Sequence, residues 1–212
     1  ITASEYRPVF VPLNNKEILD FKHIENEYVD FKKQKLLHHF LSTEGPHIAK
    51  GDVNSDGLED LYFGGAKDSP GNLYIQKKNG SFQLMVQPCL ENDKGCEDTG
   101  AAFFDADGDK DLDLYILSGG NEVLRDSPEL QDRLYLNNGN GLFTKSIDRL
   151  PVMLTSGSCV KAGDIDNDGD QDLFIGGRLV PDSYPLAPRS YILENNGKGY
   201  FKDVTERYNT SL

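Results

Sequence analysis

Three acidic segments, each followed by a short apolar run, divide most of the chain into repeats. In chain order they read KGDVNSDGLEDLYFGG, FFDADGDKDLDLYILSGG and AGDIDNDGDQDLFIGG. The first acids of the three loops, Asp52, Asp105 and Asp164, are separated by intervals of between 50 and 60 residues. A repeat of this length is typical of propeller blades or of an array of small structural units.

The remainder of each unit repeats as well. NLYIQKKNGSFQLM, DRLYLNNGNGLFTKS and RSYILENNGKGYFKDVT each combine an apolar strand, an Asn-Gly turn and a strand led by an aromatic residue. Such a turn favours a β-hairpin. A further short strand precedes each acidic motif, in PHIAKG, GAAFFD and SCVKAG. Each unit therefore supplies four strands, and the sequence predicts an all-β fold of propeller blades with four antiparallel strands each.

These units suggest the organisation of the chain. We expect blades over residues 47–98, 99–157 and 158–212, preceded by an N-terminal extension or cap over residues 1–46. Within the extension, EILDFKHIENEYVDF alternates partly as strands do, whereas FKKQKLLHHFLS favours a helical turn or two. Such a segment would complete a blade or cover an unpaired blade edge.

Oxygen-bearing side chains alternate along each acidic loop. They are Asp52, Asn54, Asp56 and Asp60 in the first loop, Asp105, Asp107, Asp109 and Asp113 in the second, and Asp164, Asp166, Asp168 and Asp172 in the third. Oxygen ligands at alternating positions around a sharp turn can wrap a hard cation with about six or seven oxygens. Calcium suits such a site better than magnesium, which retains several waters. We therefore predict about three calcium ions, with solvated acidic turns as the alternative.

Two details refine this prediction. An EF-hand is excluded because its twelfth position needs a bidentate Glu, whereas Phe63, Ile116 and Ile175 stand there. In the second loop Lys110 replaces the turn glycine and adds positive charge. Gly108, two residues earlier, eases the backbone. We expect weaker binding or lower occupancy in this middle loop.

The acidic loops, the FGG and IGG glycines after them and the NNG hairpins together resemble the FG-GAP or VCBS repeat family, which is found in integrin alpha-subunit heads. LLHHFLSTEGPHIAKGDVNSDGLEDLYFGGA is similar to bacterial FG-GAP proteins related to cartilage acidic protein. The resemblance covers residues from about 36 to 204. It implies a β-propeller, commonly of about seven blades, with calcium in the loop between the first two strands of a blade.

Carried over residue by residue, the resemblance adds three backbone carbonyl oxygens to the calcium ligands, those of Leu58, Asp111 and Asp170. Three blades do not close a ring of family size. We therefore expect an open arc of about three blades with an N-terminal extension. The remaining blades of a longer chain would continue it. Closure as a small propeller or through a homo-oligomer is the alternative.

Composition limits the partners. The 212 residues carry 22 Lys+Arg against 35 Asp+Glu, a formal net charge of -13. This balance disfavours nucleic acid and anionic membranes as partners. No apolar run reaches the roughly 18 to 20 residues of a transmembrane helix. Millimolar calcium outside cells favours a secreted or cell-surface location, extracellular or periplasmic.

The three cysteines give less information. They lack the C-x-x-C spacing of many zinc sites. Cys89 and Cys96 lie close enough for a disulfide in an oxidising compartment, and the sequence leaves that pairing open. Cys159 is expected to be a small buried residue.

No catalytic constellation stands out. The four histidines show no H-E-x-x-H spacing, and TSGSCV lacks the G-x-S-x-G pattern of a nucleophile elbow. We therefore expect a non-catalytic binding module. The variable connections AKDSPGN, NEVLRDSPELQD and RLVPDSYPLAPR would present a surface for a protein or glycan ligand. A calcium-rigidified structural spacer and an accessory part of a polysaccharide-acting enzyme are the alternatives.

Overall fold

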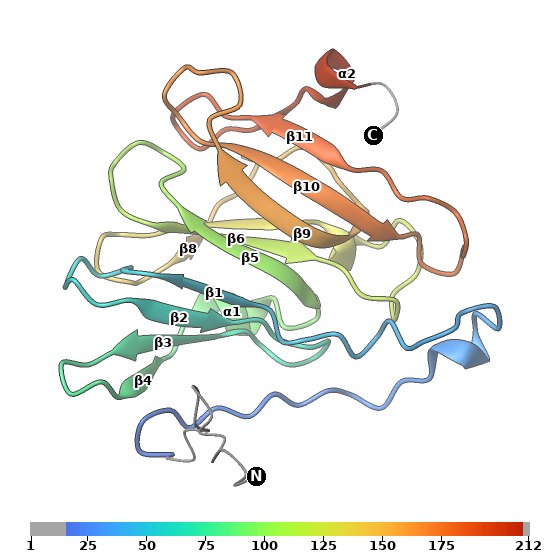
Figure 1. Ribbon diagram of the computed structural model, residues 1–212, viewed down its shortest axis with the longest axis horizontal. Coiled ribbons are helices and arrows are strands. Elements are labelled where there is room, and N and C mark those ends of the chain that lie inside the picture. The colour runs from blue at the N-terminus through green and yellow to red at the C-terminus, as the bar shows by residue number, and fades with distance from the viewer. Residues whose placement is uncertain (1–15, 210–212) are drawn as a thin grey trace, which may run out of the picture.

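The computed structural model describes residues 16–209 and consists of three four-stranded antiparallel sheets (Figure 1). The strands of each sheet are consecutive in the chain and hydrogen-bonded in chain order. The second sheet lies between the first and the third, and the three sheets do not close into a ring. The all-β prediction of an open arc of blades is confirmed.

The first sheet contains β1 (Ile48–Gly51), β2 (Asp60–Phe63), β3 (Asn72–Gln76) and β4 (Phe82–Met85). The second contains β5 (Asp98–Phe104), β6 (Asp113–Ser118), β7 (Arg133–Leu136) and β8 (Thr144–Lys145). The third contains β9 (Ser156–Gly163), β10 (Asp172–Leu179), β11 (Tyr191–Glu194) and β12 (Lys202–Asp203). Four short helices connect or flank them: η1 (Asp30–Lys32), α1 (Pro88–Asn92), η2 (Pro128–Leu130) and α2 (Thr205–Tyr208). No described helix is long and apolar enough to cross a membrane.

The core consists of two apolar layers, one on each face of the second sheet. Tyr62 and Tyr115 occupy equivalent positions, two residues after the last acid of their loops, and both are fully buried against the following sheet. Phe174 takes this position in the third sheet and is partly exposed. The repeat therefore places a large aromatic side chain on the same face of every blade.

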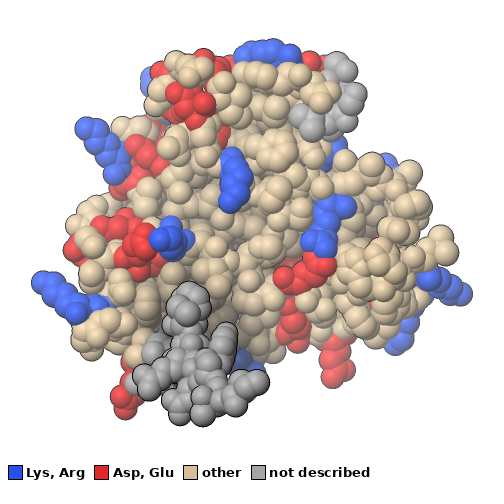
Figure 2. All heavy atoms as spheres, viewed as in Figure 1, with Lys and Arg blue, Asp and Glu red and all other residues tan. Residues whose placement is uncertain are grey.

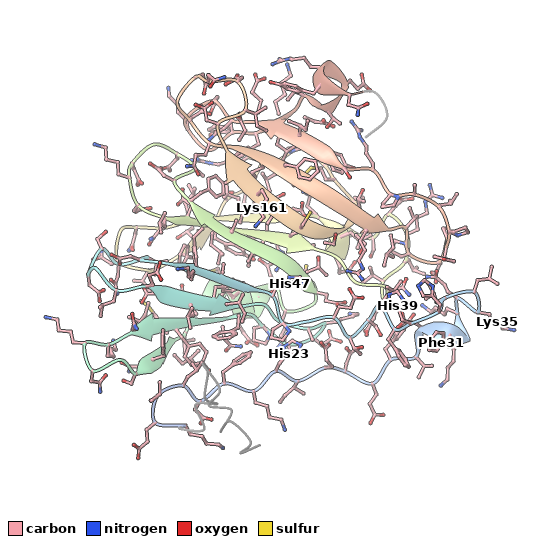
Figure 3. All side chains as sticks on the ribbon, viewed as in Figure 1. His23, Phe31, Lys35, His39, His47 and Lys161 are labelled. Atoms are coloured by element: carbon pink, nitrogen blue, oxygen red, sulfur yellow. The ribbon has the colours of Figure 1, made fainter. Side chains whose placement is uncertain are left out.

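The outer face of the third sheet differs in polarity from its equivalents. Lys161 pairs with Phe174 across β9 and β10 (Figure 3). The corresponding partners of Tyr62 and Tyr115 are Ala49 and Ala102. A charged side chain in place of alanine makes this face more polar than its equivalents. Cys159, which we expected to be buried, is exposed on the same strand because no sheet among residues 16–209 covers it. Cys89 and Cys96 are free thiols.

The N-terminal segment runs along the outer side of the first sheet (Figure 1). The backbone N–H of Phe82 donates a hydrogen bond of 2.7 Å to the Ile18 carbonyl. Phe21 stacks on Phe63 with ring centroids 4.1 Å apart. Residues 16–46 contain η1 and no strand, and residues 1–15 of the expected extension lie outside the described residues. The predicted blade boundaries stay predictions.

Candidate metal centre

Each acidic loop joins the first strand of its sheet to the second, so the three loops lie along one side of the arc (Figure 1). Acidic side chains gather along that side of the molecule (Figure 2). The connections between second and third strands lie at the opposite ends of the strands. The sheet topology thus separates the predicted metal ligands from the predicted recognition loops.

The backbone turns in the same way in all three loops. The fourth and sixth loop positions have positive φ: Ser55 (58°) and Gly57 (83°), Gly108 (83°) and Lys110 (75°), Asn167 (65°) and Gly169 (98°). The second loop thus has its glycine at the fourth position and a lysine at the sixth. A left-handed conformation is strained for Lys110 and not for glycine.

The first acid of each loop holds this turn through backbone hydrogen bonds. Its two carboxylate oxygens accept from Asp56 N and Gly57 N in the first loop (3.1 and 2.8 Å), Gly108 N and Lys110 N in the second (2.8 and 3.0 Å), and Asn167 N and Gly169 N in the third (2.7 and 3.2 Å). The loops are therefore shaped by their own acids.

The last acid of each loop is buried and connects the loop to the third strand of its sheet. One oxygen accepts from the residue after the first acid, and the other accepts from the end of the third strand. These bonds are Val53 N and Gln76 N to Asp60 (3.1 and 2.8 Å), Ala106 N and Asn137 N to Asp113 (2.9 and 2.8 Å), and Ile165 N and Asn195 N to Asp172 (2.9 and 2.8 Å). Asp60, Asp113 and Asp172 thus have a structural role in addition to the predicted ligand role.

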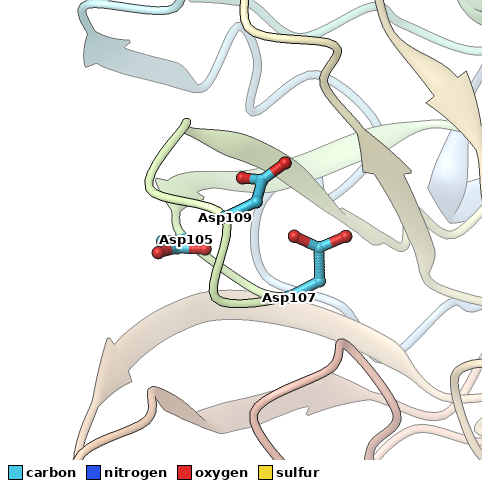
Figure 4. Close-up of side chains that lie close together, drawn as sticks. All are labelled: Asp105, Asp107 and Asp109. Carbon is cyan, nitrogen blue, oxygen red and sulfur yellow. The ribbon is translucent and has the colours of Figure 1, made fainter.

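Two loops bring three carboxylates together. Each of Asp105, Asp107 and Asp109 offers an oxygen, and these oxygens lie within 4.8 Å of one another (Figure 4). Asp164, Asp166 and Asp172 form an equivalent group within the same limit. These two clusters could hold metal ions. In the first loop Asn54 takes the place of the middle acid, so three aspartates do not gather in this way there.

Buried carboxylate oxygens in and beside the two clusters have no hydrogen-bond partner, although Arg149 lies 4.0 Å from the other oxygen of Asp107. Oδ1 of Asp107, Asp111 and Asp170 is buried without a hydrogen-bond partner. Burial, and next the charge of Asp109, raise the pKa of Asp111 to about 6. Burial, and next the charge of Asp168, raise the pKa of Asp170 to about 6. Crowded carboxylates with unpaired oxygens fit a bound cation.

The side chains of Asp111 and Asp170 are a feature that sequence reasoning missed, because only their carbonyls were predicted to face the ion. The charge of the acid two positions earlier, Asp109 or Asp168, contributes to the raised pKa of each carboxylate. Crowded carboxylates of this kind favour a proton or a cation near their oxygens. Asp111 and Asp170 stand at the seventh position of their loops, where the first loop has Leu58. Comparison of the three loops would have shown that these two carry an additional carboxylate.

A second missed feature connects neighbouring sheets. Asn195 Nδ2 donates to the carbonyl of Ala106 in the second acidic loop at 2.8 Å. Asn137 Nδ2 likewise donates to the carbonyl of Val53 in the first loop at 2.7 Å. Each amide thus links a hairpin to the acidic loop of the preceding sheet. The NNG hairpins carried this signal, which sequence reasoning assigned only to turn formation.

Comparison with known protein families identifies a match. The model of a family described as FG-GAP-like repeat matches residues 52–116 and 119–175. These two segments include all three acidic loops. No curated protein matches the chain.

Proposed function

The chain belongs to the FG-GAP-like repeat family, and from this premise we propose that it is a non-catalytic calcium-binding module of a secreted or cell-surface protein. Its recognition loops would bind a protein or a glycan. The observation that carries the calcium proposal is the repeated gathering of three carboxylates, in the second and third loops, beside buried oxygens without partners. Repeats of this family are typically non-catalytic.

Calcium would supply the positive charge that these loops lack. The carboxylates of Asp105, Asp107 and Asp109 would bind it in the second loop, and those of Asp164, Asp166 and Asp172 in the third. Asp172 already joins its loop to β11 through the Asn195 N–H. A bound ion that orders the loop would therefore also hold the end of β11, and the other end of β11 follows a recognition loop. In this way the side of the arc with the acidic loops would fix the geometry of the opposite side with the recognition loops, here called the recognition side.

The recognition side offers two exposed side chains suited to a ligand. The Arg125 side chain is 58% exposed and lies 3.5 Å from its neighbour Asp126, and Tyr184 is 42% exposed. Arg189 is held by Asp203 at 2.8 Å, so it is less available to a partner. Arginine and tyrosine are common anchors in protein interfaces. This composition supports a protein or glycan ligand.

A structural spacer is the second candidate, and the accessory part of a polysaccharide-acting enzyme is a third. The stacking of consecutive sheets on shared apolar layers supports a rigid spacer. We also propose that the chain is related to bacterial FG-GAP proteins related to cartilage acidic protein. That relationship is compatible with a binding module, a spacer or an accessory part of an enzyme.

Screening of glycan and protein arrays with the intact protein in millimolar calcium tests the binding role. The R125A/Y184A double variant should lose the signal, and E206Q, which changes an exposed acid on α2, should retain it. Absence of any specific ligand would favour the spacer. A ligand whose binding survives the double variant would contradict the assignment of the recognition side.

A further inference from the structure

One surface loop of this acidic chain is basic. Residues 31–43 contain Lys32, Lys33, Lys35, His38 and His39 and no acid, whereas the whole chain has a formal net charge of -13. We call residues 30–42 the basic loop. It contains η1 and lies on the side of the arc opposite the acidic loops (Figures 1 and 3). The net charge of the chain therefore does not describe this surface.

Buried Asp30 holds the basic loop in one shape. Its Oδ2 accepts hydrogen bonds from Leu41 N at 3.1 Å, Ser42 N at 3.2 Å and Ser42 Oγ at 2.8 Å. These bonds join the beginning of the loop to its end. Leu37, which stands between the two ends in the sequence, is buried. The loop therefore presents its remaining side chains on an ordered backbone.

The same network fastens the basic loop to two recognition loops. Asn121 Nδ2 donates to Asp30 Oδ1 at 2.6 Å, and Gln34 Nε2 donates to Asn121 Oδ1 at 2.7 Å. The Tyr184 N–H donates to Gln34 Oε1 at 3.3 Å. Asn121 follows β6 and Tyr184 follows β10, so each lies in a connection between a second and a third strand. The basic loop is therefore continuous with the recognition side.

The three lysines of the basic loop have no acidic partner. Lys32, Lys33 and Lys35 are exposed, and no ion pair to any of them is found among residues 16–209. Glu44, the next acid in the chain after Asp30, faces Arg178 instead. The loop therefore offers positive charge that a negatively charged ligand could neutralise.

The basic loop also exposes two large apolar side chains. Leu36 is 74% exposed and Phe40 is 45% exposed. The Phe40 ring packs against the Phe31 ring with centroids 4.8 Å apart, which anchors it. Leu186, two residues after Tyr184 in the adjoining recognition loop, is exposed as well. Apolar side chains beside exposed charges match the apolar centre and polar rim of a protein interface.

We propose that the basic loop binds an acidic segment of a partner protein, whose carboxylates face the three lysines and whose apolar side chains contact Leu36 and Phe40. Exposed leucine and phenylalanine together favour a peptide over an acidic glycan, whose surface consists mainly of hydroxyl and charged groups. The three lysines would face each other in a symmetric contact between two copies of this chain. The net charge of -13 disfavours an anionic membrane. This inference rests on the proposed binding role and names a protein as its ligand.

Fluorescence anisotropy of short synthetic peptides, with the intact protein in millimolar calcium, tests the proposal. The probe contains Glu with Leu and Phe, and in the two control peptides Ser replaces the apolar residues or Lys replaces Glu. The probe should bind most tightly. K32S/K35S should weaken its binding roughly 2- to 30-fold, and L36S roughly tenfold.

Matched variants separate this surface from general effects of charge and hydrophobicity. K77S/K78S removes the same charge from two exposed lysines between β3 and β4, and I147S removes an exposed apolar side chain between β8 and β9. Both should bind the probe as wild type does. Equal binding of the probe by wild type, K32S/K35S and L36S, or tighter binding of the Lys peptide, would overturn the proposal.

Heparin and vesicles of phosphatidylserine and phosphatidylcholine represent the other anionic ligands. Binding of either one that depends on Lys32 and Lys35, without binding of the acidic peptide, would overturn the choice of a protein partner. If K32S/K35S and L36S still bind an array ligand that R125A/Y184A loses, the proposed binding role stands and only this proposal fails.

Discussion

Replacement of Asp172 by alanine should destabilise the protein even when no metal is present. The residue is 2% exposed, and its carboxylate accepts from Asn195 N at 2.8 Å and Ile165 N at 2.9 Å. The buried Asn195 N–H left without an acceptor costs about 1–3 kcal/mol, and the partly exposed Ile165 N–H about 1 kcal/mol. We expect a loss of about 3 kcal/mol. For a chain of this size that lowers Tm by about 6–12 °C.

The assay is thermal unfolding of the metal-free protein in chelator, followed by circular dichroism. Asp164 provides the matched control, because it belongs to the same loop and its hydrogen bonds are exposed. D164N should stay within about 1 kcal/mol of wild type in chelator, because exposed hydrogen bonds contribute little. It should lose calcium-dependent stabilisation instead. If D172A has the same Tm as wild type in chelator, Asp172 serves only as a metal ligand and the structural role assigned to it is wrong.

Three further results are expected. K110G should raise the free energy of unfolding by about 0.5–1 kcal/mol because φ is 75° there, and a gain of the same size in K110A would contradict this reason. N195A should lose about 1–2 kcal/mol in urea unfolding, since its amide donates to Ala106 O; an unchanged midpoint would show that the link between sheets is weak. Burial raises the pKa of Glu97 to about 8 and of Asp132 to about 7. Both folded-state pKa values lie above the unfolded ones, so stability in chelator should fall as pH rises from about 5 to about 8, and a rise over that range would refute the assignment.

The repeats predicted the fold because strand order within each blade depends on local signals. Acidic turns, Asn-Gly hairpins and short apolar runs each specify neighbouring strands. Those signals lie within about one repeat length, so a single sequence contains them. The positions of the acidic loops and the polarity of their side chains could be predicted from the same local signals.

Contacts between distant segments were not predictable in the same manner. Asn195 reads as a turn residue, and only the packing of sheets shows that it bonds to Ala106. Glu97 reads as a surface acid, yet it is buried with its carboxylate against Gly120. Cys159 was expected to be buried because cysteine usually is, yet it lies on an uncovered face. Burial depends on which segments meet in space, and a repeat pattern does not specify that.

The central claim is that the acidic loops bind calcium. Thermal unfolding in millimolar calcium and in excess chelator, on the same preparation, tests it most directly. Ligand bound only to the folded state contributes about 2.7 kcal/mol per site at a hundred times Kd, which corresponds to a rise in Tm of about 5–10 °C per site. We predict such a rise for wild type and a smaller one for D105N/D164N. An identical midpoint in calcium and in chelator would contradict the claim.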